Sequence, residues 1–291
     1  MKTLKDYIIN EASLLDIEGT IEGGEEAIKK SIEKWIKDNF VVEQLKISDI
    51  PNEEGKYKVS ASGEVHVQNS KRSKLLHLTN NLFVWETVYT FDCWNCLSLK
   101  SLEGAPREVI NIFNCENCNS LTTLEGAPEK VHTFYCNDCD NLTSLKGAPK
   151  EVGGEFYCSE CKSLKSLEGS PEKVKEHFNC TYCHALTSLE GAPKEVGGSF
   201  NCSHCLSLKS LEGAPNYVAL SFSCTYCYAL TSLEGAPKKV GRDFYCSGCS
   251  SLTSLEGAPK KVGRYFYCSQ CDSLKSIDLP TTTKIKGRIC K

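Results

Sequence analysis

Long apolar runs and an excess of charge of either sign are both missing from this sequence. No segment approaches the roughly 20 consecutive apolar residues that a membrane-spanning helix needs, although 40% of the 291 residues are hydrophobic. The formal net charge is only -3, so no strong overall field attracts nucleic acid or an anionic membrane. We therefore expect a folded protein that has neither a membrane nor nucleic acid as its partner.

Recognisable targeting and catalytic motifs are missing as well. The start, MKTLKDYIINEASLLD, is charged within its first six residues and contains no uninterrupted apolar stretch, so no secretory signal is visible. There is no Walker loop, no Gly-rich dinucleotide turn and no nucleophile accompanied by a base and an orienting group. We predict a cytoplasmic protein that is not an enzyme, and we expect it to need no cofactor and to bind no small molecule.

Cysteine, by contrast, is abundant, with 19 copies. In a reducing cytosol thiols stay free or bind metal, and an odd number of them in a chain without an export signal argues against a disulfide framework. All but the last fall into C-x-x-C pairs, which step along the chain at a nearly constant interval. The first cysteines of these pairs are Cys93, Cys115, Cys136, Cys158, Cys180, Cys202, Cys224, Cys246 and Cys268.

The cysteine pairs mark a repeat. The interval is 22 residues, with one step of 21 that loses a residue between Val131 and Phe134. The repeated unit reads F-x-C-x-x-C-x-x-L-x-S-L-E-G-A-P-x-x-V. A constant period of this length is the signature of an architecture in which each unit buries its apolar edge only against its neighbours. We predict an α+β repeat protein whose residues 91–280 form a β-solenoid of about nine coils.

Within one unit, the residue pattern predicts which side chains point inward. Phe244 and Cys246 alternate with polar residues, which predicts a short, half-buried strand, and stacked units would align such strands into a parallel sheet with a spacing of about 4.8 Å. The Gly-Ala-Pro run predicts a turn at a corner, after which Val262 leads the chain back inside. The inward positions are then Phe, Cys, Cys, Leu, Leu and Val, and nine coils would form a rod about 43 Å long.

These motifs bear a resemblance to known repeats. The run F-x-C-x-x-C-x-x-L is similar to the L-x-L-x-x-N/C-x-L core of leucine-rich repeats, with Phe and the first Cys in the two Leu places and the second Cys in the Asn/Cys place. The unit also resembles the short BspA-like leucine-rich repeats, and the run SLEGAPKEVGG (188–198) resembles repeat proteins of tailed bacteriophages that have no known role. The resemblance covers residues from about 57 to 280. It implies a leucine-rich-repeat-like fold, a viral origin and a place in the host cytoplasm or the virion, but no activity.

The residues before and after the array differ from the repeat. Residues 24–56 predict a helical cap, which a solenoid needs because its end exposes an apolar cross-section. Within this cap, Gly24 to Asn39 predict an amphipathic helix with these residues on its apolar face: Ala27, Ile28, Ile32, Trp35 and Ile36. Residues 57–90 predict strands and degenerate first coils, and residues 1–23 a flexible N-terminal arm. Residues 281–291 predict a basic tail, strand-like or frayed.

The C-x-x-C pairs allow two interpretations. Pairs separated by 18 residues match the zinc template C-x₂-C-x₁₅₋₂₀-C-x₂-C on spacing alone. Against this, the first cysteine lies next to an inward Phe, where a neutral thiol packs well and a thiolate is disfavoured. The second takes a turn position where related repeats use Asn to bond backbone groups across coils. Tetrathiolate sites would also pair the coils two by two, yet every coil is alike. We favour a buried structural ladder without metal and keep a zinc- or iron–sulfur-binding protein as the alternative.

The outward residue between Phe and the first Cys predicts a column along the sheet. The column consists of Asp92, Asn114, Tyr135, Tyr157, Asn179, Asn201, Ser223, Tyr245 and Tyr267. Its composition suits protein recognition, because it combines large amphipathic side chains with adaptable hydrogen bonding. The alternative is a solvated side of the ladder, where stacking between coils adds only stability. We predict a protein-binding face at Tyr135, Tyr157, Asn179, Asn201, Tyr245 and Tyr267.

Charged residues also recur at equivalent positions of successive units, so they are expected to form columns along the solenoid. The turn before Gly-Ala-Pro carries Glu103, Glu125, Glu168, Glu190, Glu212, Glu234 and Glu256, with Lys146 as the exception. Lysines at the next corner (Lys150, Lys194, Lys238, Lys260) are expected to offset them. The C-terminal end gathers Lys238, Lys239, Arg242, Lys260, Lys261, Arg264, Lys284, Lys286, Arg288 and Lys291. An acidic or phosphate-bearing partner is one interpretation of this end, and a solvated rim is the one we favour. His184 and His204 are expected to be exposed at the edge between strand and loop.

Three hypotheses of function follow. The leading one is a non-enzymatic interaction or scaffolding module, virus-encoded, that presents the Tyr/Asn-rich face to a protein partner. The second is a metal-loaded protein that uses its stacked C-x-x-C pairs. The third is a purely structural spacer.

Overall fold

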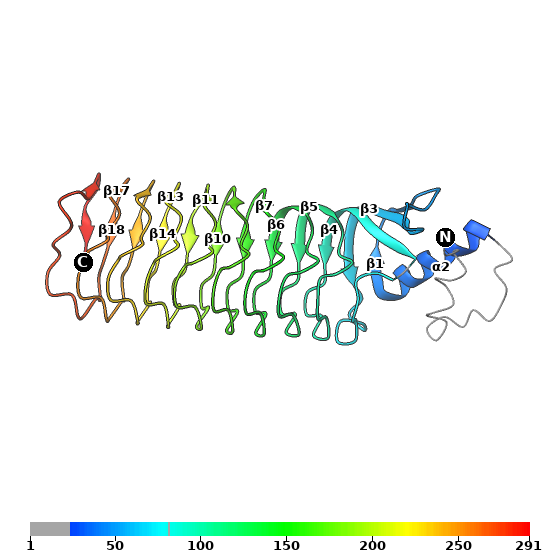
Figure 1. Cartoon of the computed structure of the whole chain (residues 1–291), viewed down its shortest axis with the longest axis horizontal. Coiled ribbons are helices and arrows are strands. Elements are labelled where there is room, and N and C mark those ends of the chain that lie inside the picture. The colour runs from blue at the N-terminus through cyan, green and yellow to red at the C-terminus, as the bar shows by residue number, and fades with distance from the viewer. Residues whose placement is uncertain (1–23, 81) are drawn as a thin grey trace.

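The structure is a computed structural model that describes residues 24–80 and 82–291. These residues form an elongated parallel β-solenoid of about 11 coils of ~22 residues, with one helix at the N-terminal end (Figure 1). The predicted fold class is therefore confirmed. The predicted N-terminal arm, residues 1–23, lies outside the described residues.

The helix α2 (Gly24–Asn39) packs over the first coil, and its bounds agree with the prediction. Ile32 and Ile36 are fully buried, and Trp35 packs against the core beside them. Ala27, which the sequence analysis placed on the same apolar face, is exposed. The reason is that the first helical turn extends past the coil that the following turns cover. Only the later turns of α2 close the apolar cross-section.

Three strands join the helix to the array. β1 (Phe40–Val42) and β2 (Leu45–Ile47) pair antiparallel with β3 (Tyr57–Val67), and β3 pairs in parallel with β4 (Phe83–Asp92). The antiparallel cap thus changes into the parallel solenoid at β3. Aromatic rings in edge-to-face and tilted contact pack the cap onto the first coil: Trp35, Phe40, Phe83, Trp85 and Phe91.

The parallel sheet begins with long strands and then divides. β4 is followed by β5 (Glu108–Asn114) and β6 (Lys130–Tyr135), and β6 pairs with both β7 and β8. From there each coil contributes two short strands. The valine ladder consists of β7 (Glu151–Val152), β9 (Lys173–Val174), β11 (Glu195–Val196), β13 (Tyr217–Val218), β15 (Lys239–Val240), β17 (Lys261–Val262) and β19 (Lys284–Ile285). The phenylalanine ladder consists of β8 (Phe156–Tyr157), β10 (Phe178–Asn179), β12 (Phe200–Asn201), β14 (Phe222–Ser223), β16 (Phe244–Tyr245), β18 (Phe266–Tyr267) and β20 (Ile289–Cys290).

A tight bend separates the two ladders. In the later coils Gly241 and Gly263 follow the valine, and a Cβ atom at either position would collide with a backbone carbonyl one coil earlier. The bend is itself hydrogen-bonded between coils, since Gly263 N–H donates to Val240 O at 2.9 Å. The residue pattern predicted one strand per coil, at the phenylalanine. The second strand, at the valine, was not predicted.

The Gly-Ala-Pro corner is a turn, as predicted. Gly257 has φ +83°, which a residue with a side chain rarely adopts, and the Ala258 N–H donates to Leu255 O at 3.1 Å. Pro259 is buried, and the equivalent prolines are buried in the other coils. Proline therefore adds an inward position that the sequence analysis did not include.

The core is a set of stacked side-chain columns that run the length of the array. Phenylalanines from Phe91 to Phe266 stack nearly parallel, with neighbouring ring centroids 5.0–5.7 Å apart. The paired cysteines, both leucines and the valine of these coils are buried as well, which confirms the predicted inward positions. Ile289 continues the phenylalanine column by pairing with Phe266, so the predicted tail is strand-like. The structure has more coils than the nine predicted from the cysteine pairs. The additional coils come from strands at the two ends of the array, where the cysteine pair is absent.

Replacing Phe178 by alanine should lower the free energy of unfolding by about 3–5 kcal/mol. Its ring lies between those of Phe156, at 5.5 Å, and Phe200, at 5.0 Å, so a cavity would interrupt the stack. Guanidinium unfolding followed by circular dichroism measures the change. The exposed Glu176 provides the control, since Glu176→Ala should shift stability by less than about 0.5 kcal/mol. Equal shifts for the two variants would contradict a packed phenylalanine column.

Candidate functional site

The predicted binding residues lie in one line along the phenylalanine ladder. The register pairs Tyr135 with Tyr157, Asn179 with Asn201, and Tyr245 with Tyr267. Tyr157 pairs with Asn179, and Ser223 joins Asn201 to Tyr245. The structure therefore brings all six predicted residues together on one surface, which we call the tyrosine face. Each of them is half-buried, because its neighbours in adjacent coils cover its flanks.

Two tyrosine pairs stand at the two ends of this face. Tyr135 and Tyr157 have ring centroids 5.2 Å apart in a tilted arrangement, and Tyr245 and Tyr267 stack at 4.6 Å with an interplanar angle of 6°. Burial, reinforced by the Glu155 carboxylate, raises the pKa of Tyr157 to about 12. This phenol therefore stays protonated at neutral pH and can donate a hydrogen bond.

A shallow depression of about 440 Å³ lies beside the second pair. Its lining consists of Ser199, Phe200, Asn201, Ser221, Ser223, Thr225 and Tyr245. The hydroxyls of Ser203, Ser223 and Thr225 hydrogen-bond to one another at its edge, with oxygen–oxygen distances of 2.7–3.4 Å. Small polar side chains thus keep the surface low between the two tyrosine pairs.

The two asparagines of the face have a structural task as well. Asn179 Oδ1 accepts the backbone N–H of Thr181, and Asn201 Oδ1 accepts that of Ser203, both at 3.0 Å. Such bonds hold the turn that follows the strand. Among the described residues, the side-chain NH₂ groups of both asparagines have no acceptor within hydrogen-bond distance. Their amide N–H groups are therefore the part that a partner can use.

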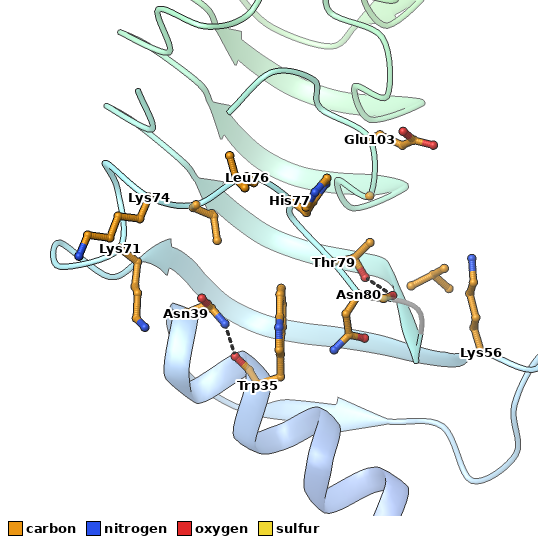
Figure 2. A pocket seen from close by; sticks show the side chains of 13 residues that line it. Trp35, Asn39, Lys56, Lys71, Lys74, Leu76, His77, Thr79, Asn80 and Glu103 are labelled. Carbon is orange, nitrogen blue, oxygen red and sulfur yellow. Dashed lines mark hydrogen bonds between the residues drawn. The ribbon is translucent and has the colours of Figure 1, made fainter. Parts of the chain in front are cut away.

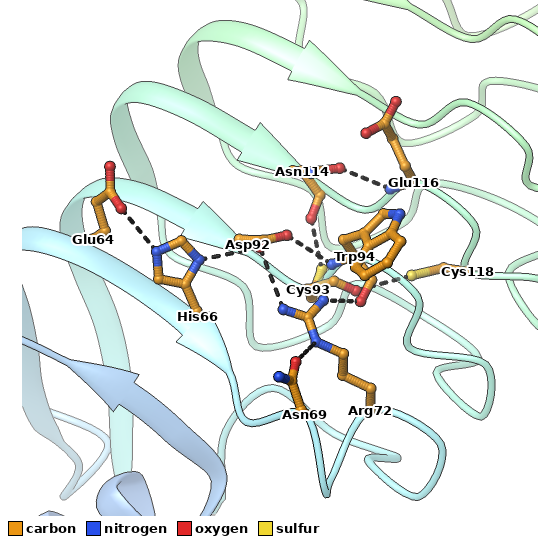
Figure 3. Close-up of polar contacts among 10 residues, drawn as sticks. All are labelled: Glu64, His66, Asn69, Arg72, Asp92, Cys93, Trp94, Asn114, Glu116 and Cys118. Atoms are coloured by element: carbon orange, nitrogen blue, oxygen red, sulfur yellow. Dashed lines mark hydrogen bonds and ion pairs between the residues drawn. The ribbon is translucent and has the colours of Figure 1, made fainter.

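Beyond Tyr135 the same outward column continues through Asn114 to Asp92, where it meets a network of charged groups at the cap (Figure 3). His66 Nδ1 lies 3.1 Å from Asp92 Oδ2 and its Nε2 lies 2.8 Å from Glu64 Oε2, while Arg72 lies 3.4 Å from the same Asp92 oxygen. The Arg72 guanidinium also lies 5.1 Å from the ring centroid of Trp94. Partial burial lowers the pKa of His66, but its hydrogen bonds to Asp92 and Glu64 outweigh this, so the net shift is upward from 6.5. The network joins the cap strand β3 to the first coil.

A cavity of about 710 Å³ lies between the cap helix and the loop before β4 (Figure 2). Lys56 lies on one side of the opening, and Lys71 and Lys74 on the other (Figure 2). Asn39 Nδ2 donates to Trp35 O at 2.8 Å, which uses its amide within the helix end. The lysines do not converge on one point, so this cavity is a weaker candidate for a binding site than the tyrosine face.

The cysteines form a hydrogen-bonded ladder inside the coils. The second cysteine of a pair donates its S–H to the carbonyl of the first cysteine one coil earlier, as Cys118 does to Cys93, with distances of 3.1–3.3 Å from Cys118 to Cys271. The first cysteine donates forward, as Cys93 does to Asn114 O at 3.2 Å. Burial raises the pKa of the Cys93 thiol to about 12. Within residues 24–80 and 82–291, no three His, Cys, Asp or Glu side chains are grouped for a metal ion.

One surface feature was missed by the sequence analysis. Tyr182, His204 and Tyr226 stack on one another between the paired cysteines of successive coils, at centroid distances of 4.5 and 4.8 Å. His184 also packs against Tyr182, at 6.1 Å. Both histidines are half-buried, and not the freely exposed side chains that we predicted. His204 lies between aromatic rings of the two adjacent coils, and His184 packs beside Tyr182 of its own coil, with its Nδ1 3.0 Å from His204 O of the next.

The glutamate column is not offset in the predicted way. Within the described chain, the corner lysine Lys194 pairs with Glu172, at 3.8 Å, and the ion pair inside the column is Lys146 with Glu125, at 3.4 Å. The remaining column glutamates are exposed. Because exposed carboxylates are well solvated and screened, the column does not need counter-charges to persist.

Comparison of the chain with protein-family models, with curated proteins and with solved structures gives no match. The described residues include no helix with the length and apolar character to cross a bilayer.

In the native protein, Ellman's reagent should label Cys290 rapidly, Cys271 more slowly, and the other thiols only on unfolding. Every cysteine except Cys290 is buried, and at Cys93 and Cys139 burial also raises the pKa to about 12, which suppresses the reactive thiolate. The exception among the buried thiols is Cys271, whose pKa is lowered to about 7, chiefly by its hydrogen bond to Cys246, so it should react second. Cys290→Ser should abolish the fast phase. Fast labelling of many thiols in the folded variant would contradict a closed core.

The cap should be more stable at mildly acidic pH. A folded-state pKa of His66 raised above its unfolded value of about 6.5 adds stability below that value, and this stability is lost as the pH rises through the folded pKa. Melting temperatures at about pH 5.5 to 8.5 should therefore fall more steeply for the native sequence than for His66→Gln. An equal change of melting temperature with pH in both proteins would show that the contacts of His66 with Asp92 and Glu64 do not favour its protonated form.

Proposed function

We propose that this protein is a non-enzymatic module that binds a protein partner on the tyrosine face. The observation that carries the proposal is the pairing of Tyr135 with Tyr157 and of Tyr245 with Tyr267 on either side of a low polar surface. Tyrosine offers a large contact area at a small cost in conformational entropy, and stacking against a neighbour restricts it further. Two rigid anchors around a polar centre resemble the composition of protein recognition surfaces.

The distance between the two tyrosine pairs sets the minimum length of the partner segment that contacts both. Tyr157 and Tyr245 are four coil steps apart, which at about 4.8 Å per step is roughly 19 Å. A single side chain cannot reach both anchors, whereas an extended segment of about six residues can. The amide N–H groups of Asn179 and Asn201 lie between the anchors and suit the carbonyl groups of such a segment.

The similarity of the repeat to those of tailed-phage proteins supports a virus-encoded module. Its partner would then be a phage component or a host factor.

Replacing both Tyr157 and Tyr245 by serine should abolish capture of the partner without unfolding the rod. The test is an affinity pull-down from the native host, quantified by mass spectrometry, with circular dichroism as the check of folding. Tyr228→Ser is the matched control, because Tyr228 is an equally large tyrosine, 47% exposed, that lies away from the face. Retention of the same proteins by the double variant would refute this face.

Removal of residues 180–201, one complete coil, separates a binding face from a spacer. The deletion joins Asn179 to Cys202 and restores the repeat, but it shortens the distance between the anchors by about 4.8 Å. A spacer tolerates the deletion, whereas a face with two anchors loses its partner.

A further inference from the structure

Positive charge is concentrated at one end of the rod. Residues 236–291 contain eleven lysines and arginines against four aspartates and glutamates, a net charge of +7, while the rest of the chain contains 23 against 33, a net charge of -10. The two values give the overall -3. The Debye length is about 10 Å at 0.1 M salt, which is roughly the height of two coils. The two coils within this distance, residues 192–235, contain two lysines against three glutamates, so they do not neutralise this end.

The cations of this end form an ordered array. Lys239, Lys261 and Lys284 occupy the same register position in three successive coils of the valine ladder. Arg242 and Arg264 follow in the bend and are neighbours, since the Arg264 N–H donates to Arg242 O at 2.9 Å. We call these five residues the basic array, and all five are exposed.

The side chains of the basic array are not held in ion pairs, and the nearby Asp243 is buried and accepts the backbone N–H of Tyr265 at 3.0 Å. In the part of the chain that the structure describes, none of its five side chains forms an ion pair, whereas Lys173 in an earlier coil of the same ladder pairs with Glu195 at 3.0 Å. Like charges at coil spacing repel one another. An anionic chain laid along the coils would relieve this repulsion and release its own counterions.

Aromatic rings lie among the cations. Lys239 Nζ lies 4.7 Å from the ring centroid of Tyr217, and Arg264 Cζ lies 5.3 Å from that of Tyr265. These contacts hold each cation over a ring face. Tyr265 also touches Tyr267, with ring centroids 6.0 Å apart. Cations that alternate with aromatic side chains are typical of surfaces that bind single-stranded nucleic acid, where phosphates meet the cations and bases meet the rings.

We propose that the basic array, with Tyr217 and Tyr265, binds single-stranded nucleic acid. The guanidinium groups of Arg242 and Arg264 present the planar donor pairs that match phosphate oxygens, and the ladder repeats its cations at regular steps along one direction. An acidic protein segment would use the cations but leave the tyrosine rings without a partner. Nucleic acid was not expected from the net charge, because that value averages two ends that do not interact.

The test is fluorescence anisotropy with a fluorescein-labelled 20-nucleotide oligo(dT) and the full-length protein at several salt concentrations. Replacing the five array residues by glutamine should weaken binding at least tenfold. It should also reduce the salt slope by up to about 3.5, because each of the five lost contacts to single-stranded phosphate removes roughly 0.7. The control is a variant with equal loss of charge on the acidic coils, in which these exposed lysines become glutamine: Lys100, Lys150, Lys165, Lys194 and Lys209. This control should bind as the native protein does.

A second variant tests the rings. Tyr217→Ser combined with Tyr265→Ser should weaken binding several-fold with little change in the salt slope, because stacking releases no counterions. The proposal is overturned if the native protein does not bind oligo(dT) at 50 mM salt, if the array variant binds as tightly as its control, or if poly-glutamate competes as well as the oligonucleotide. Tyr157→Ser should leave oligonucleotide binding unchanged, so a failure here is separable from a failure of the tyrosine face.

Discussion

Everything in this molecule depends on keeping adjacent coils in register. A 22-residue coil has too little interior to fold alone, and it is stable only when its neighbours complete its hydrogen bonds and cover its apolar edges. The cysteine thiols take part in this directly, because from Cys118 onward the second cysteine of each pair donates to a backbone carbonyl one coil earlier. A thiol is small enough to remain inside a packed column and still offers one donor. The cysteines therefore contribute cohesion between coils.

The register between coils constrains the inward residues of each coil but leaves the outward residues free to vary. The inward columns of Phe, Cys, Leu and Val are almost invariant from coil to coil, whereas outward positions differ and still lie in line with their counterparts. A change of residue in one coil therefore places a new side chain at a known height on a known surface. The tyrosine face and the basic array both arise in this way, as does the stack of Tyr182, His204 and Tyr226.

The parts of the fold that rest on periodicity could be predicted from the sequence. The bounds of α2, the inward positions and the alignment of the six face residues follow from periods of 3.6, 2 and 22 residues. Features that depend on unusual backbone conformations could not be predicted in this way. Tyr182, His204 and Tyr226 have φ of 57–59°, a conformation that aromatic residues seldom adopt. Asn95, Asn117, Asp138 and Gly248 at the same position in other coils were a usable signal, because these residue types favour positive φ.

Charge is the property for which a rod differs most from a globular protein. In a compact domain every charge lies within a few Debye lengths of the others, so the net value describes the field that a partner meets. In an array of about 11 coils each exposed charge acts over only about two coils, so a partner meets the local charge beneath each of its parts and not the net value. Burial raises the pKa of Tyr245 most, the Asp243 carboxylate adds to this rise, and Arg264 opposes it with the smallest effect, whereas at Tyr157 burial and the carboxylates of Glu155 and Glu176 all raise the pKa. The surface beside Tyr157 is thus the more negative of the two, because Arg264 partly offsets Asp243 at Tyr245, and a partner that spans both tyrosine pairs should place its strongest positive charge at the Tyr157 end.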